Sequence, residues 1–180
     1  MSAAEGGPLA VVLAGGLSRR MGRPKAVVPL GGRPLIAWPL AAARAAGLDA
    51  VVVAKPGSPL PPLDVPVWDE PDEPAHPLTG LVAALERAGR PIVALACDMP
   101  FVTPELIARL AAMRGVAAPP GEAFPARYEP SALRALRAGL AREASLREML
   151  AGATPVDADA AELVGINDPE ALARAEAALR

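Results

Sequence analysis

"PLAVVLAGGLSRRMGRPK" occupies residues 8–25 and joins a short apolar run to a basic, glycine-rich loop. The apolar part, residues 8–14, has no helical period and therefore predicts a buried strand. The loop that follows does not match a Walker A sequence, because Gly22 is followed by Arg23 instead of the Lys-Ser/Thr pair. It also lacks the spacing and the directly following helix of a dinucleotide-binding fingerprint. The stretch thus predicts a strand that ends in a loop of a different type.

Apolar runs and helical patterns alternate along the rest of the chain. Further strands are predicted at residues 50–54, 65–68 and 90–100. Helices are predicted at residues 33–47, 78–89, 103–113, 130–140, 145–152 and 168–179, with Thr79 and Asp168 as N-caps. This alternation predicts an α/β protein with three α/β/α layers around a mostly parallel sheet. A length of 180 residues favours a single domain over residues 1–180, in which residues 1–7 are expected to be flexible.

Composition excludes several classes of protein. The formal net charge of −2 and the 3% aromatic content argue against a nucleic-acid partner. The single cysteine, Cys97, cannot form an internal disulfide, which favours a reducing compartment. No signal peptide or membrane span is evident, so we expect a cytoplasmic protein with no membrane partner.

The loop concentrates groups that bind anions. Gly15 and Gly16 lack Cβ atoms, so a ligand could approach their backbone N–H groups closely. Four cationic side chains follow within ten residues: Arg19, Arg20, Arg23 and Lys25. Polyphosphate is the natural partner of this combination, and a solvated basic loop is the alternative.

Two oxygen-bearing side chains come at the ends of segments that a parallel sheet would bring near this loop. Asp98 directly follows the apolar run "IVALAC", and opposite a polyphosphate it would be a candidate Mg²⁺ ligand. Asn167 is the only asparagine and precedes the last helix. The alternative for both is a local role in a turn or at a helix start. His76, in a proline-rich loop, is interpreted as an incidental surface residue.

No protein nucleophile or base is evident, since a single His and a single Cys do not supply a zinc site or a Cys-His dyad at ordinary spacing. A phosphate anion that attacks another phosphate needs no deprotonation near neutral pH. Catalysis then requires alignment and charge neutralisation by a metal ion and cationic side chains.

The motifs resemble a known family. "LAGGLSRRMGRPKAVVPLGGRPLI" is similar to the signature of nucleotidyltransferases that attach NMP to an acceptor phosphate and release pyrophosphate. Together with "CDMPFVTPELI", "PARYEPSALRALRAGL" and "INDPEAL", it most resembles the molybdenum cofactor guanylyltransferases of the MobA type. The resemblance runs from about residue 8 to the C-terminus and implies a Rossmann-like nucleotidyltransferase fold.

The resemblance also implies roles for individual residues. It places the nucleotide-contacting loop on Leu13, Ala14, Gly15 and Gly16, and it assigns phosphate contacts to Arg20 and Lys25. It makes Asp98 a Mg²⁺ and nucleotide ligand, Asn167 a second metal ligand, and Asp69, before "HPLTGL", a nucleotide contact. Two positions depart from the family pattern, with Pro24 where an Asp is common and Ala54 where an Asn is common. Both leave the base and ribose contacts open.

The implied reaction is transfer of GMP from GTP to the molybdenum-molybdopterin cofactor with Mg²⁺. Proteins of molybdenum insertion and molybdoenzyme maturation are the implied protein partners. Three alternatives remain open at this point: a cytidylyltransferase of the same cofactor, a nucleotidyltransferase of sugar or small phosphates, and a nucleotide-binding regulatory module. Retention of both Lys25 and Asp98 favours an enzyme.

Overall fold

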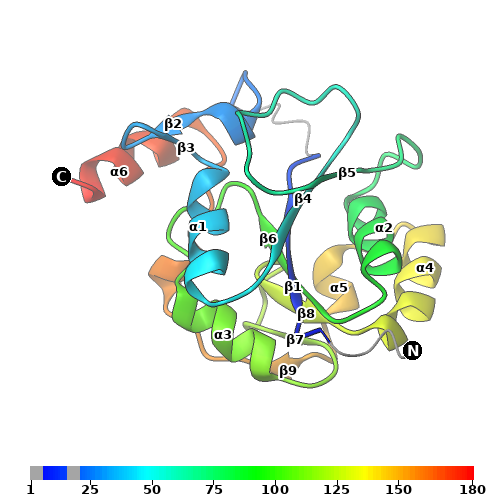
Figure 1. The fold of residues 1–180 in the computed structure, drawn as a ribbon. Coiled ribbons are helices and arrows are strands. Elements are labelled where there is room, and N and C mark those ends of the chain that lie inside the picture. Colours follow the sequence, from blue (N-terminus) through cyan, green and yellow to red (C-terminus); the bar gives the residue numbers. More distant parts are fainter. Residues whose placement is uncertain (1–5, 16–20) are drawn as a thin grey trace.

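The central feature of the fold is a seven-stranded sheet with strand order β5-β4-β1-β6-β8-β7-β9 (Figure 1). The structure is a computed structural model of the chain and describes residues 6–15 and 21–180. The strands of this sheet are β1 (Leu9–Leu13), β4 (Ala50–Ala54), β5 (Val67–Asp69), β6 (Ile92–Ala96), β7 (Ala117–Ala118), β8 (Ala126–Tyr128) and β9 (Thr154–Pro155).

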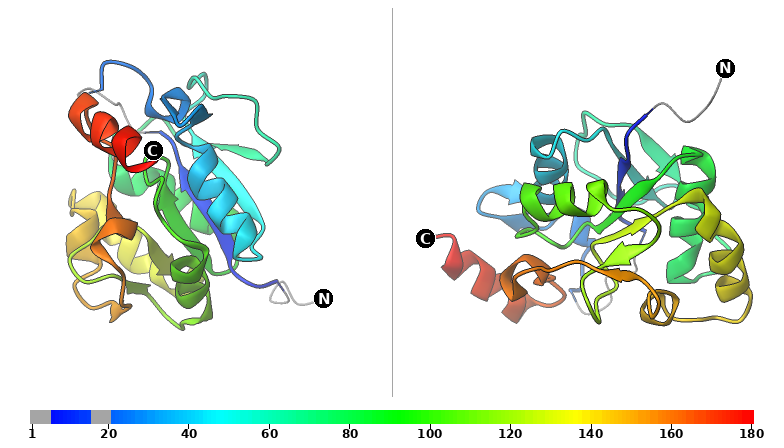
Figure 2. Two further views of the ribbon diagram at one scale, coloured as in Figure 1. Left: turned by 90° about the vertical axis from the view of Figure 1, so that its left-hand side faces the viewer. Right: turned by 90° about the horizontal axis from the view of Figure 1, so that it is seen from below.

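Helices cover both faces of the sheet, which confirms the predicted three α/β/α layers (Figures 1 and 2). Helices α1 and α3 pack on one face, and α2, α4 and α5 pack on the other. Their bounds are α1 (Ala37–Ala45), α2 (Pro77–Ala88), α3 (Pro104–Ala112), α4 (Leu133–Ala141) and α5 (Leu146–Met149). A sixth helix, α6 (Pro169–Ala178), lies at one end of the sheet, beside a small β-hairpin.

The central strands are apolar throughout because each is buried on two sides. β1 runs parallel to both β4 and β6, with Val11 paired to Val51 on one side and to Ala94 on the other. Val11 packs with the α2 side of the core, and Val12 packs with the α1 side. Successive side chains of a strand point to opposite faces of the sheet, so β1 contributes to two separate hydrophobic cores.

Several short elements were not predicted from the sequence. β8 runs antiparallel to both of its neighbours, β6 and β7, whereas β7 and β9 pair in parallel and run in the same direction as β6. The hairpin joins β2 (Pro29–Leu30) to β3 (Arg33–Pro34), and the 3₁₀ turns are η1 (Lys25–Val27), η2 (Pro130–Ala132) and η3 (Ala160–Leu163). The hairpin and α6 share a third hydrophobic cluster, which includes Leu30, Ile166 and Ala171.

Two local predictions differ from the structure. Helix α2 begins earlier than expected, and its N-cap is His76, whose Nδ1 accepts a hydrogen bond from the Leu78 N–H at 3.1 Å. The predicted cap, Thr79, lies inside the helix and donates its hydroxyl to the Pro74 carbonyl. Asp168 caps α6 as predicted.

Residues 1–5 of the expected flexible N-terminus lie outside the described residues, whereas the Gly7 carbonyl accepts a hydrogen bond from Arg90. In the part of the chain that the structure describes, no helix has the length and apolar character needed to cross a bilayer.

Candidate active site

The candidate site lies where the parallel strands β1, β4 and β6 end. Ala14 donates its N–H to the Val53 carbonyl at 2.8 Å, and the Leu13 carbonyl accepts the Cys97 N–H at 3.2 Å. These bonds hold the start of the glycine-rich loop between the ends of β4 and β6. This is the edge at which open α/β sheets bind their ligands.

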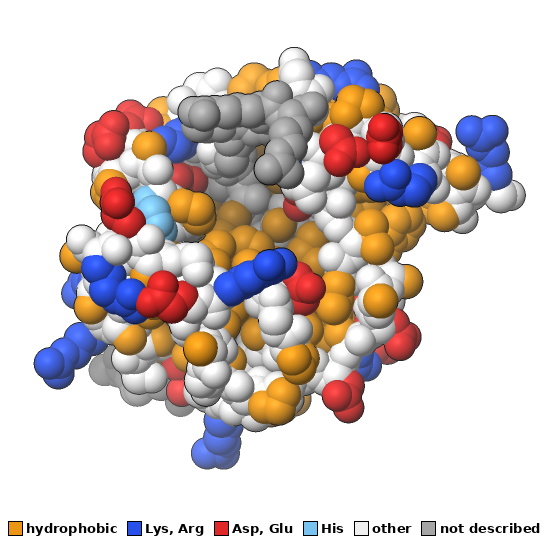
Figure 3. All heavy atoms as spheres, turned by 180° about the vertical axis from the view of Figure 1, so that it is seen from behind, with side chains coloured by type: hydrophobic (Ala, Val, Ile, Leu, Met, Phe, Trp, Pro, Cys, Tyr) orange, Lys and Arg blue, Asp and Glu red, His pale blue; other side chains and the backbone are white. Residues whose placement is uncertain are grey.

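A cavity of about 400 Å³ opens at this edge and is visible as a hollow with hydrophobic side chains on its floor in Figure 3. Leu13, Gly15, Lys25 and Asp98, which the sequence indicated, all line it. The volume is within the range of small-molecule sites. The structure therefore brings residues from distant parts of the chain to one cavity.

Lys25 joins two of the predicted site residues directly. Its Nζ lies 2.5 Å from Asp98 Oδ2 and 2.6 Å from Asn167 Oδ1. The side chains of Lys25 and Asp98 are 18% and 12% exposed, so the ion pair is largely withdrawn from solvent. The Ile166 N–H donates to the Asp98 backbone carbonyl at 2.8 Å, which fixes the C-terminal segment against the end of β6.

The donor set of Asp98 and Asn167 fits a hard divalent cation. One carboxylate oxygen and one amide oxygen already converge on a single positive charge, the Lys25 ammonium. Mg²⁺ takes such oxygen ligands and completes its coordination with phosphate oxygens and water. No group of three or more His, Cys, Asp or Glu that could hold a metal occurs among the described residues.

Asp69 was expected to contact the nucleotide, and the structure places it and its neighbour Glu70 differently with respect to the cavity. Asp69, the last residue of β5, is exposed and does not line the cavity. Glu70 follows it, lines the cavity and is only 9% exposed. Side chains alternate in direction along an extended chain, so only one of two consecutive acidic residues can point inward. The sequence "WDEPDE" alone did not show which one does.

Three further residues in the cavity bear on the chemistry. His76, expected to be incidental, lines the cavity as well as capping α2, and Lys55 lines it while donating to the Asp72 carbonyl at 3.1 Å. Burial, reinforced by the charge of Asp98, raises the pKa of the Cys97 thiol to about 12. Cys97 is therefore a protonated packing residue and is not an available nucleophile.

Two predicted site residues, Gly16 and Arg20, lie outside the described residues. Ala14 is half-buried, does not line the cavity, and packs against the α1-side core.

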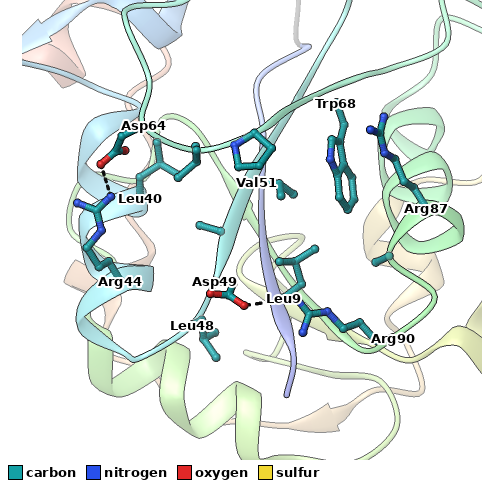
Figure 4. A pocket seen from close by; sticks show the side chains of 14 residues that line it. Leu9, Leu40, Arg44, Leu48, Asp49, Val51, Asp64, Trp68, Arg87 and Arg90 are labelled. Atoms are coloured by element: carbon teal, nitrogen blue, oxygen red, sulfur yellow. Dashed lines mark hydrogen bonds and ion pairs between the residues drawn. The ribbon is translucent and has the colours of Figure 1, made fainter. Parts of the chain in front are cut away.

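A second cavity, of about 630 Å³, lies toward the amino ends of the strands (Figure 4). Its cationic side chains already have partners. Arg44 pairs with Asp64, and Arg87 stacks over the Trp68 ring at 4.7 Å. Arg90 lies 3.7 Å from Asp49, as the dashed line in Figure 4 indicates. This cavity lies at the opposite edge of the sheet from the usual ligand position.

A family model and a curated relative indicate the same protein family for this chain. The model of the MobA-like NTP transferase domain matches residues 10–159. The molybdenum cofactor guanylyltransferase of Rhodobacter capsulatus is 38% identical, over 94% of this chain and 95% of its own length.

Solved structures agree in fold. The molybdopterin-guanine dinucleotide biosynthesis protein A of Archaeoglobus fulgidus superposes with a TM-score of 0.76 at 25% identity, covering 94% of this chain and 97% of that protein. The 2-C-methyl-D-erythritol 4-phosphate cytidylyltransferase of Thermus thermophilus gives a TM-score of 0.72 at 28% identity, covering 95% and 98%. The sheet, the motifs and these matches agree, and the chain belongs to the MobA-like NTP transferase family.

Proposed function

We propose that this protein transfers GMP from GTP to the molybdenum-molybdopterin cofactor, forming a guanine dinucleotide and releasing pyrophosphate. The convergence of Lys25, Asp98 and Asn167 at the end of the parallel strands is the observation that carries the proposal. The 38% identity to a guanylyltransferase over nearly the whole chain supports the choice of nucleotide and acceptor.

In this reaction an oxygen of the acceptor's terminal phosphate forms a bond to the α-phosphorus of GTP. The bond from the α-phosphorus to the α–β bridging oxygen breaks, and its electrons leave with pyrophosphate. The attacking phosphate is already an anion, so no side chain has to remove a proton. Lys25 neutralises negative charge on the triphosphate, and Arg20 is proposed to do the same.

Asp98 and Asn167 are the residues proposed to hold Mg²⁺. When bound, such an ion supplies positive charge to the triphosphate oxygens and helps to orient them. The Asp98 backbone is held by the Ile166 N–H, which donates to its carbonyl, and the low exposure of the Asp98 side chain strengthens its interaction with any cation. We also propose a cytoplasmic location, and interactions with proteins that insert molybdenum or mature molybdoenzymes.

The test is to incubate the protein with the molybdenum cofactor and, in turn, GTP, CTP or ATP, and to identify the product by mass. We expect a guanine dinucleotide and one pyrophosphate per turnover, with kcat/KM for GTP at least about tenfold above that for CTP, the scale at which a polar pocket discriminates between bases. A cytosine product would overturn the guanylyl assignment. Transfer to sugar phosphates but not to the cofactor would overturn the choice of acceptor.

A further inference from the structure

Two of the three residues that converge at the candidate site come from segments outside the central sheet. Lys25 begins η1, which leads into the hairpin of β2 and β3, and Asn167 lies just before α6. Asp98 instead comes shortly after β6 of the central sheet. The contact between the Lys25 ammonium and the Asn167 amide oxygen therefore depends on how the hairpin and α6 are held together.

The hairpin and α6 pack against each other in the third hydrophobic cluster. Among the described residues, none of the buried members of this cluster belongs to the central sheet. Figure 1 shows α6 beside the hairpin at one end of the molecule. Ile166 connects the cluster to the site, because its side chain is fully buried in the cluster while its N–H donates to the Asp98 carbonyl at 2.8 Å. A peripheral cluster of this kind opens locally more readily than a central sheet does.

A polar contact fastens α6 to the turn of the hairpin. Gly31 and Gly32 form this turn, with φ values of +55° and +76° that suit glycine. Glu176, in the last turn of α6, accepts the Gly31 N–H through Oε1 at 3.0 Å. Leu179 packs at the same place, since a Cβ atom on Gly31 would lie 3.1 Å from its Cδ1. The Glu176 carboxylate thus holds the C-terminal helix on the segment that follows Lys25.

We propose that Glu176 is a positioning residue for the transfer reaction. By holding α6 on the hairpin, it keeps Asn167 within reach of the Lys25 ammonium and beside Asp98. Glu176 does not line the cavity, so it acts through Asn167. Small displacements of a positioned group lower reaction rates steeply, even when the cause lies far from the reacting atoms. The kinetic part of this inference rests on the proposed guanylyl transfer, whereas the placement of Asn167 can be measured without it.

Amide hydrogen exchange, followed by NMR in protein without metal or nucleotide, measures this placement. In Glu176→Ala the Ile166 amide should exchange about fivefold faster, the change in local opening that loss of a single hydrogen bond produces. Glu176→Gln keeps an acceptor oxygen for the Gly31 N–H and should stay within about twofold of wild-type protein. The Ala14 amide is the internal reference, because its bond to the Val53 carbonyl belongs to the main sheet and should be unaffected.

Glu170→Ala is the matched control for both measurements. Glu170 lies on the same helix, is 90% exposed and pairs with Arg174 at 3.8 Å, so it makes no link to the hairpin. Its removal should change neither the exchange of the Ile166 amide nor the rate of transfer. A thermal melt of each variant verifies that it is folded.

The kinetic measurement uses GMP transfer to the molybdenum cofactor. Glu176→Ala should lower kcat by about threefold with KM for GTP unchanged, a smaller effect than that on exchange because most molecules keep the segment docked. Glu176→Gln should restore the wild-type kcat. In an Asn167→Ala background, Glu176→Ala should have no further effect, since it acts through that residue.

The outcomes separate this inference from the proposed function. Unchanged exchange of the Ile166 amide in Glu176→Ala would overturn the inference. An equal loss of kcat with and without Asn167 would overturn it as well, because Glu176 would then act by another route. If wild-type protein transfers no GMP to the cofactor, the proposed function and the kinetic role are wrong, whereas faster exchange at Ile166 would still show that Glu176 holds this segment in place.

Discussion

The ion pair between Lys25 and Asp98 allows a quantitative prediction about stability. At an effective dielectric constant of about 20, opposite unit charges at the observed 2.5 Å attract by about 7 kcal/mol, and in bulk water by about 2 kcal/mol. Desolvation of both groups opposes this attraction, and the side chains retain 18% and 12% exposure. We therefore expect a net coupling energy of about 2 kcal/mol, the usual size for a charge-assisted hydrogen bond.

A double-mutant cycle measures this coupling. Lys25→Met, Asp98→Ala and the double variant are compared with wild-type protein by urea unfolding, followed by circular dichroism in metal-free and nucleotide-free buffer. The control cycle pairs Lys55→Met with Asp98→Ala, because Lys55 lines the same cavity but donates to the Asp72 carbonyl. Its coupling should be near zero. A Lys25–Asp98 coupling below about 0.5 kcal/mol, the ordinary deviation from additivity, would refute the reasoning.

Three further predictions concern the same cavity. Asp98→Ala should lower kcat in the guanylyl assay by about 100-fold or more, the scale for losing a key electrostatic group, and EDTA should abolish wild-type turnover; near-normal rates in either case would contradict its role as a metal ligand. Gly15→Ala should change the free energy of unfolding by less than about 1 kcal/mol, because the added Cβ meets the movable end of the Glu70 side chain. Calorimetry should nevertheless show weaker GTP binding. Unaltered GTP affinity would show that the close approach of Glu70 to Gly15 does not shape the nucleotide site. Burial raises the pKa of Glu70 above 4.5, with Lys55 opposing, so its ionised form destabilises the folded state as pH rises through that pKa. Glu70→Gln should therefore stabilise the protein more at pH 7 than at pH 4 in urea unfolding, and an equal effect at both pH values would be inconsistent with this.

The main elements of the fold could be predicted because their signals are local. The apolar runs that became β1, β4 and β6 are long enough to stand out, and the helices have clear spacing. The reversed strand β8 is only three residues long, and its direction depends on pairing with β6 rather than on its own sequence. The hairpin of β2 and β3 has two residues per strand, which is too short for any period to show.

The candidate residues of the site could be selected from the sequence, but the contacts between them could not. Lys25, Asp98 and Asn167 were each identified from a motif or a strand end, and the structure joins all three. The Lys25 ammonium contacts both the Asp98 and the Asn167 oxygen because of tertiary packing, and no feature of the sequence indicated this. Glu70 was missed because two acidic residues follow β5 together, and only the register of that short strand decides which one faces inward.

The order in which the chain is made has a consequence for the contacts of Lys25. The two oxygens that its ammonium meets lie 73 and 142 residues further along the chain. On the ribosome, the glycine-rich loop and the first strands emerge long before Asn167 does. Domains tend to fold as units during synthesis. A nascent chain in which the glycine-rich loop has emerged still lacks the Asn167 amide oxygen that binds the Lys25 ammonium. A growing chain is therefore expected to gain transfer activity only after the segment before α6 has been synthesised and docks onto Asp98.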